Sequence, residues 1–105
     1  MKQLFYSAKA REDMRGILQK IAEDRLEVAV LFVDRLAEHA RILERFPEAG
    51  TAQPDLYLGL RMFPYRGYAV YYRMHDDRTT VERVLALGLD VRAELFTDNG
   101  EKNIS

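Results

Sequence analysis

The sequence predicts an α+β domain: a short N-terminal strand, an antiparallel helical hairpin, and a three-stranded antiparallel meander that forms one sheet packed on the helices. Apolar residues recur at helical spacing between residues 8 and 46. Three segments rich in β-branched and aromatic residues follow between residues 58 and 87, separated by short turns. The length of 105 residues and the hydrophobic share of 48% are typical of one folded unit. We therefore assign residues 1–105 to a single domain, with 97–105 as a loose tail.

The first two elements follow from local composition. Residues 2–6 are rich in β-formers and predict a strand. Ser7 is a good N-cap for a helix over residues 8–23. The apolar stripe of this helix consists of Ala10, Met14, Ile17, Leu18 and Ile21.

The second helix is predicted from Asp24 to Phe46. Asp24 and Glu27 have the spacing of a capping box, and Pro47 stops the helix. Its core stripe is predicted to hold Val28, Phe32, Leu36, Ala40 and Leu43. Because the break between the two helices is short, we expect them to pack antiparallel.

One stretch of the second helix, residues 28–33, is apolar on every side. Val30 and Leu31 fall in rows whose other members are charged and should face water. A helix that is apolar all round is buried on more than one side. Either the first helix and the sheet cover these residues, or a partner protein does.

The strands of the meander are predicted at residues 58–63, 68–74 and 79–87, with turns at 64–67 and 75–78. Residues 48–57 are predicted as a loop and residues 90–96 as a final turn or helix. The middle strand alternates, so its two faces carry different side chains. One face holds Tyr68, Val70, Tyr72 and Met74, and the other holds Ala69, Tyr71 and Arg73.

Charge and composition limit the function classes. The net charge is −1, so no global field favours nucleic acid, and we expect neither sequence-specific DNA binding nor membrane association. The chain has no cysteine and no apolar N-terminal segment, which favours a cytoplasmic protein. Twelve of the sixteen basic residues are arginines. Arginine makes forked contacts with carboxylate and phosphate.

The usual catalytic and metal-binding residues are missing. Ser7 has a capping role and Ser105 has no base beside it, so neither is a credible nucleophile. His39 and His75 lie far apart in the sequence and lack cysteine partners, which argues against zinc. The sequence predicts no catalytic residue, no metal and no cofactor.

Tyrosines and arginines are interleaved on the predicted strands, between Arg61 and Arg73. Stacking platforms for single-stranded nucleic acid use this mixture. A tyrosine-rich sheet face packed under helices uses it as well. Both interpretations remain open at this point.

The order of these elements, together with four short motifs, resembles the ParE/RelE superfamily of toxins from bacterial toxin–antitoxin pairs. The likeness extends from Leu4 to Phe96. The motifs are L-x-x-F-P-x-x-G (43–50), L-G-L-R (58–61), G-Y-A-V-Y-Y-R (67–73) and V-x-R-V-L (81–85) followed by Gly88 and Asp90. The resemblance implies a small cytosolic protein that a co-expressed antitoxin inhibits.

The RelE branch of this superfamily cuts messenger RNA in the ribosome with basic side chains and often a terminal tyrosine. At the positions that match this pattern, the chain has Ala69, Asp90 and Phe96. Ala69 and Phe96 have no group that could hold a phosphate or transfer a proton, and Asp90 is acidic where the pattern has a basic residue. The mismatches argue against a ribosome-dependent endoribonuclease, which remains the alternative function.

The ParE branch is similar in fold and is known for poisoning DNA gyrase by binding, without chemistry of its own. The chain departs from that pattern too, since the common His-Gly after the last strand is Leu87-Gly88. The favoured hypothesis is a ParE-like toxin that inhibits gyrase and is not an enzyme. A non-toxic protein-binding domain of the same fold is a further alternative.

Two sets of candidate site residues follow from the resemblance. Arg61, Arg73, Arg83 and Arg92 are the predicted target contacts, with at least one of them expected in an internal ion pair. Val30 and Leu31 are predicted to bind an antitoxin that has an acidic or amphipathic tail.

Overall fold

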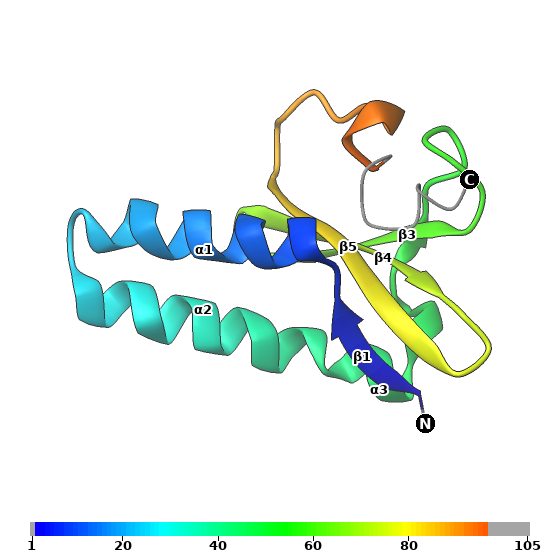
Figure 1. Ribbon diagram of the computed structural model, residues 1–105, viewed down its shortest axis with the longest axis horizontal. Coiled ribbons are helices and arrows are strands. Elements are labelled where there is room, and N and C mark those ends of the chain that lie inside the picture. Colours follow the sequence, from blue (N-terminus) through cyan, green and yellow to red (C-terminus); the bar gives the residue numbers. More distant parts are fainter. Residues whose placement is uncertain (1, 97–105) are drawn as a thin grey trace.

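The computed structural model describes residues 2–96, so the predicted tail at 97–105 lies outside the described residues. Its elements alternate as the sequence predicts, with two short additions (Figure 1). They are β1 (Gln3–Tyr6), α1 (Ala8–Ala22), α2 (Leu26–Ala40), α3 (Ile42–Arg45), the 3-10 turn η1 (Pro47–Ala49), β2 (Thr51–Ala52), β3 (Leu60–Tyr65), β4 (Tyr68–Met74), β5 (Arg78–Ala86) and the 3-10 turn η2 (Ala93–Phe96).

The strands form one five-stranded mixed sheet in the order β1-β5-β4-β3-β2. The predicted meander is confirmed, because β3, β4 and β5 pair antiparallel in sequence order. Strand β1 joins the sheet parallel to β5, and the two-residue strand β2 extends the other edge within the predicted loop. The connection between β1 and β5 therefore spans the whole helical hairpin and most of the meander.

The antiparallel hairpin of α1 and α2 covers one face of the sheet and extends beyond it (Figure 1). Ser7 caps α1 as predicted, since its side chain accepts a hydrogen bond from the N–H of Ala10 at 3.0 Å. The main core lies between hairpin and sheet. Its fully or nearly buried members are Ala10, Ile17, Leu36, Leu43, Val70, Tyr72, Val81 and Val84.

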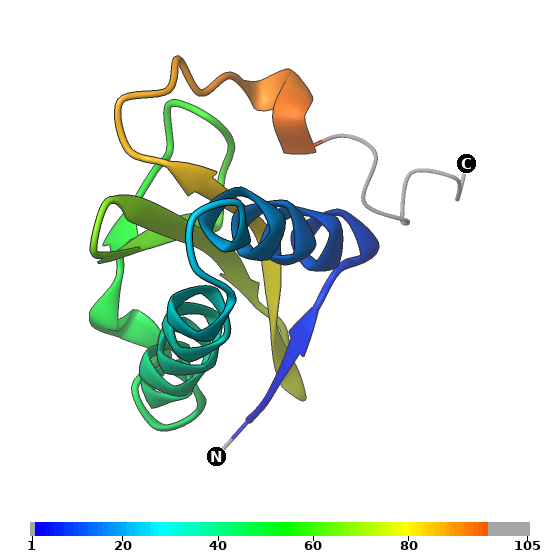
Figure 2. The ribbon, with the colours of Figure 1, turned by 90° about the vertical axis from the view of Figure 1, so that its left-hand side faces the viewer.

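The opposite face of the sheet carries a second apolar cluster. It consists of Leu60, Ala69, Tyr71, Leu85 and Phe96. The turn η2 supplies Phe96 from the side of the sheet away from α2 (Figure 2). The predicted alternation of β4 is confirmed, because Val70 and Tyr72 belong to the first cluster and Ala69 and Tyr71 to the second.

The second helix differs from its prediction at both ends. Asp24 is not its N-cap: the N–H groups of Asp24 and Arg25 bond back to the carbonyl of Ile21 and continue the end of α1. Arg25 occupies the N-cap of α2 without a side-chain hydrogen bond. The predicted continuous helix also breaks at Arg41, where the N–H bonds to Glu38, three residues back.

This break re-aims the short helix α3 toward β1. The backbone carbonyl of Glu44 accepts the N–H of Lys2, and its carboxylate accepts the N–H of Leu4 at 3.2 Å. Glu44 thus satisfies two donors on the outer edge of β1. An edge strand covered in this way is protected against pairing with another chain.

The first turn of the meander is tighter than predicted. Strand β3 continues to Tyr65, and the connection to β4 is the two-residue pair Arg66-Gly67. Both residues have positive φ, 40° for Arg66 and 86° for Gly67. This is the backbone of a type I′ hairpin turn, which matches the twist of the flanking strands.

Candidate functional site

The sequence-predicted target contact Arg83 lies at a bulge in β5. Tyr71 pairs with Arg83 and Tyr72 with Val81, so Glu82 is the extra residue. The Arg83 guanidinium makes two hydrogen bonds of 2.8 Å to the carboxylate of Asp13 in α1. Both side chains are 13% exposed, and the hydrogen bonds that Arg83 donates to Asp13 raise the pKa of Arg83. Arg83 therefore forms an internal ion pair, as was expected for at least one of these four arginines.

Arg73 lies on β4 and contacts Glu82, the extra residue of the same bulge. Its Nε is 3.2 Å from a carboxylate oxygen of Glu82, whose side chain is 2% exposed. The Arg73 guanidinium also sits over the ring of Tyr57, 5.6 Å from the centroid. A charge as buried as Glu82 needs such a partner. Arg73 keeps about a third of its side chain exposed (32%), so part of it remains accessible.

Arg61 forms hydrogen bonds at the corner between α3 and the sheet. Its guanidinium donates to the carbonyl of Gly50 at 2.7 Å. The N–H of Gly50 in turn donates to the hydroxyl of Tyr72 at 2.8 Å, and that hydroxyl donates to the carbonyl of Pro47. Burial raises the pKa of Tyr72. A Cβ on Gly50 would come within 2.6 Å of the Tyr72 oxygen, so the glycine is required here.

The four predicted target contacts do not form one surface. Directly paired strand residues share a face, and Arg61 pairs with Tyr72 whereas Arg73 pairs with Leu60. Since Tyr72 and Leu60 belong to the two different clusters, Arg61 and Arg73 lie on opposite faces of the sheet. Arg92 lies beyond β5, bonded to Asp90, with 70% of its side chain exposed. Their role in target contact stays a prediction.

The predicted antitoxin contacts Val30 and Leu31 are 46% and 49% exposed. The fold therefore covers only about half of each side chain, and their contact with an antitoxin stays a prediction. Val28, predicted for the core, is also exposed at 47%, and Ala29 takes its place in the core. Only the first member of the predicted stripe is displaced, because Leu36, Ala40 and Leu43 are buried as predicted. Half-exposed apolar side chains remain on the N-terminal part of the helix.

Leu31 and Val30 differ in their surroundings. Leu31 lines a hollow of about 160 Å³ between α2 and the β3–β4 turn, and Val30 does not. We call this hollow the α2–turn groove; it is lined by Val28, Leu31, Phe32, Arg35, Tyr65 and Arg66. Its floor is aromatic, since the ring of Phe32 lies 5.7 Å from the rings of both Tyr65 and Tyr68.

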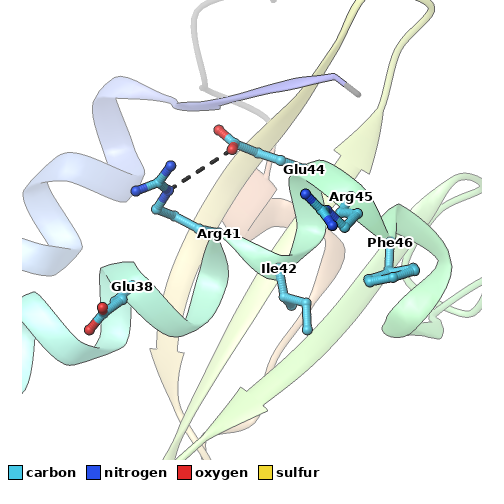
Figure 3. A pocket seen from close by; sticks show the side chains of 6 residues that line it. All are labelled: Glu38, Arg41, Ile42, Glu44, Arg45 and Phe46. Atoms are coloured by element: carbon cyan, nitrogen blue, oxygen red, sulfur yellow. Dashed lines mark ion pairs between the residues drawn. The ribbon is translucent and has the colours of Figure 1, made fainter.

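A second hollow, of about 530 Å³, lies at the corner between α2 and α3 (Figure 3). Ile42 and Phe46 point to the same side of α3, and Arg41 reaches toward Glu44, 4.0 Å away (Figure 3). The lining holds two acidic and two basic side chains: Glu38, Glu44, Arg41 and Arg45. Its charges balance one another, and Glu44 is engaged on β1.

The positions that matched the nuclease pattern are occupied by packing residues. Ala69 is 1% exposed and Phe96 is 6% exposed, both within the second apolar cluster. The ring of Phe96 packs edge-on against Tyr71 at 5.3 Å and Tyr57 at 5.8 Å. Asp90 pairs with Arg92 in solvent. These positions therefore carry an apolar contact and a surface ion pair.

Two further observations bear on metals and membranes. Within residues 2–96, no group of three or more metal-ligating side chains converges, and His39 stacks on Phe63 at 4.9 Å. In the same part of the chain, no helix has both the length and the apolar character needed to cross a bilayer.

Three residues that organise this site were not predicted from the sequence. They are Asp13, which pairs with Arg83, Glu44, which bonds to β1, and Tyr72, whose hydroxyl bonds to two backbone groups. The motif L-x-x-F-P-x-x-G contained a signal for the last, because Pro47 and Gly50 are the two partners of the Tyr72 hydroxyl. Asp13 and Glu44 gave no signal, since their partners lie 70 and 40 residues away in the sequence.

Two solved structures with a similar fold come from toxin–antitoxin systems. The chromosomal ParDE system from P. aeruginosa matches with a TM-score of 0.71 and 19% identity, over 82% of this chain and 96% of that chain. The toxin–antitoxin complex RelBE2 from Mycobacterium tuberculosis matches with a TM-score of 0.62 and 19% identity, over 81% of this chain and 96% of that chain. The comparison with curated proteins gives no match.

The fold is therefore that of the RelE/ParE class of toxins. The family model for the ParE toxin of the type II toxin–antitoxin system parDE matches residues 4–90, which is most of the chain. The chain belongs to the ParE toxin family, and its membership implies a cognate antitoxin as partner.

Proposed function

We propose that this protein inhibits DNA gyrase by binding to it, without breaking a covalent bond itself, and that its cognate antitoxin neutralises it in the cytoplasm. The family and the fold define a toxin of a toxin–antitoxin pair. The choice of gyrase as the target is our inference from the ParE branch.

The observation that carries this proposal is the packing of Ala69 and Phe96 in the second apolar cluster. Cleavage of RNA needs cations at the phosphate and a proton-transferring group near the ribose hydroxyl. The nuclease pattern places such groups at these two positions and at Asp90. Here two of the positions are apolar and buried, and the third is acidic and would repel a phosphate.

The accessible arginines supply the proposed contacts with the target. Arg92 is the most exposed of the four predicted residues and Arg73 is partly exposed, whereas Arg83 is committed to Asp13 and Arg61 to the backbone at Gly50. We therefore expect Arg92 and Arg73 to contribute more to target binding than Arg61 and Arg83. Charge-assisted hydrogen bonds from arginine suit an acidic protein surface or a DNA phosphate.

The antitoxin is proposed to cover the apolar band of α2 that includes Val30 and Leu31. Half-exposed apolar side chains are unfavourable in water, and where they gather they mark interaction surfaces. An amphipathic segment that orders on the toxin would bury them.

Supercoiling by purified gyrase tests the proposal. Relaxed plasmid, ATP and gyrase are incubated with increasing amounts of this protein, with and without its antitoxin. The proposal predicts loss of supercoiling that the antitoxin restores. Unaffected supercoiling, combined with ribosome-dependent cleavage of mRNA by the same preparation, would favour the endoribonuclease alternative. The fold similarity to RelBE2 is the reason to test that alternative.

A further inference from the structure

The α2–turn groove combines apolar walls with two positively charged side chains. Val28, Leu31 and Phe32 supply its apolar side, and Arg35 and Arg66 are its charged residues. Among the described residues that line it, none is acidic. Glu27 and Glu38 belong to the same helix but lie outside the lining. The hollow at the α2–α3 corner, in contrast, has as many acidic as basic residues.

The size of the groove limits what can enter it. A cavity of about 150 Å³ accommodates a benzene-sized apolar group, and this hollow measures about 160 Å³. One large apolar side chain therefore fits against Leu31 and the aromatic floor. The arginines at the rim would then contact groups next to that side chain in the partner's sequence.

The backbone at Arg66 gives an independent reason to regard this residue as functional. Its φ of 40° lies in the left-handed region, where asparagine or glycine is preferred at the first position of a type I′ turn. A long side chain there strains the turn. Nothing in the turn needs an arginine, because its guanidinium contacts only its neighbour, the ring of Tyr65, at 5.8 Å among the described contacts. Strain that the fold does not require is often retained for binding.

We propose that the α2–turn groove receives an amphipathic, acidic segment of the cognate antitoxin: one apolar side chain enters the hollow, and flanking carboxylates pair with Arg35 and Arg66. This inference rests on the proposed neutralisation by an antitoxin and assigns it a specific surface and a specific partner chemistry. Pairing of Arg with carboxylate in a partly desolvated groove gives specificity as well as affinity.

The test measures the affinity of the full-length protein for its cognate antitoxin, by calorimetry at two salt concentrations. Arg35→Gln and Arg66→Asn are compared with Arg15→Gln. Arg15 is an exposed arginine of α1 that lies outside the groove, so it controls for the loss of one positive charge from an exposed helix position. Thermal unfolding of each variant reports folding separately.

The proposal predicts that Arg35→Gln and Arg66→Asn each raise Kd by about tenfold, and that Arg15→Gln changes it little. Arg66→Asn carries a further signature: its Tm equals or exceeds that of the unmodified protein, because asparagine suits the left-handed position better. A variant that folds at least as well and binds less tightly separates a binding role from a structural one. The loss should be smaller at high salt, where ion pairs are screened.

Four results would overturn the inference. An unchanged Kd for both groove variants would show that the antitoxin does not bind in the groove. The proposed neutralisation and the proposed inhibition of gyrase would still stand. Loss of gyrase inhibition in these variants with unchanged antitoxin affinity would assign the groove to the target. A concentration-dependent dimer of this chain that Leu31→Asn dissociates would assign it to a second copy. If the unmodified protein binds no antitoxin, the proposed neutralisation fails together with the groove.

Discussion

Asp13 and Arg83, 70 residues apart in the sequence, join the first helix to the bulge of β5 through two hydrogen bonds of 2.8 Å. The same carboxylate accepts the backbone N–H of Val84 at 2.9 Å, and the same guanidinium donates to the carbonyl of Leu95. One ion pair therefore connects the helical hairpin, the sheet and the C-terminal turn. Arg83, one of the arginines predicted for target contact, therefore has a structural role, and its contact with a target stays a prediction.

Asp13→Asn is expected to destabilise the protein by about 2–4 kcal/mol, because it leaves the mostly buried guanidinium of Arg83 without a counter-charge. Urea unfolding followed by circular dichroism measures the change. Asp90→Asn is the control, since Asp90 and Arg92 form an exposed pair that contributes at most about 1 kcal/mol. Equal effects of the two substitutions would show that the Asp13–Arg83 pair has no special structural role.

Replacing Gly50 and Gly16 by alanine should change the free energy of unfolding in opposite directions. Gly50→Ala places a Cβ within 2.6 Å of the Tyr72 hydroxyl and 2.8 Å of the Met62 carbonyl, and should cost about 1–3 kcal/mol. Gly16 lies in α1 with nothing within 4 Å of an added Cβ. Gly16→Ala should therefore stabilise the helix by about 0.5–1 kcal/mol. Thermal or urea unfolding measures both, and a stabilised Gly50→Ala variant would contradict the packing described at that corner.

Tyr72→Phe should destabilise the protein by about 1–3 kcal/mol, because the N–H of Gly50 and the carbonyl of Pro47 lose their partner inside the fold. Tyr68→Phe is a useful comparison, since Tyr68 is a partly buried member of the same cluster and has no hydrogen bond of this kind among those described. Urea unfolding of the two variants separates the loss of the hydroxyl pairing from the general effect of removing an oxygen.

Stability should fall as the pH rises above about 10. Burial raises the pKa of Tyr6, Tyr71 and Tyr72 above 10.0 in the folded state. Above that pH the unfolded chain releases these protons while the folded chain keeps them, so the unfolded state binds fewer protons and is favoured. Below the unfolded pKa the three hydroxyls contribute no pH dependence. Phenolate absorbance and unfolding free energy, measured from pH 8 to 11.5, check this; stability that stays constant through that range would contradict it.

Replacing Val30 and Leu31 together by serine should weaken the antitoxin complex more than it affects folding. Both side chains are about half exposed, and surface substitutions usually change stability by about 0.5 kcal/mol or less. Affinity for the antitoxin and the urea midpoint are measured on the same preparation. An unchanged affinity would mean that the partner covers a different surface.

Much of the fold was predictable because it follows from local signals. The cap at Ser7, the stop before Pro47 and the alternation of β4 are set by neighbouring residues, and the structure confirms them. Errors occurred where tertiary contacts override local preference. The break at Arg41 has no local breaker and follows from the position of Glu44 on the edge of β1. The capping box predicted at Asp24 is wrong because the N–H of Asp24 bonds to the carbonyl of Ile21 and extends the end of α1.

The candidate site was less predictable for a related reason. An arginine that binds a partner and an arginine in an internal ion pair have the same appearance in a sequence. Arg83 could be assigned only when its carboxylate on α1 was known, and Arg66 only when the φ of its turn was known. The exposed band at Val30 and Leu31 was visible in the sequence because six consecutive apolar residues exceed what one helix face can bury.

The most direct test of the central claim, that this protein acts by binding gyrase, is the amount of cleaved plasmid trapped with purified gyrase when detergent and protease are added. The account predicts that linear DNA, covalently held by gyrase before proteolysis, accumulates with increasing toxin and disappears when antitoxin is present. It also predicts that Arg92→Gln reduces this accumulation. Gyrase that turns over normally at saturating toxin, while the same sample degrades mRNA on ribosomes, would contradict the account.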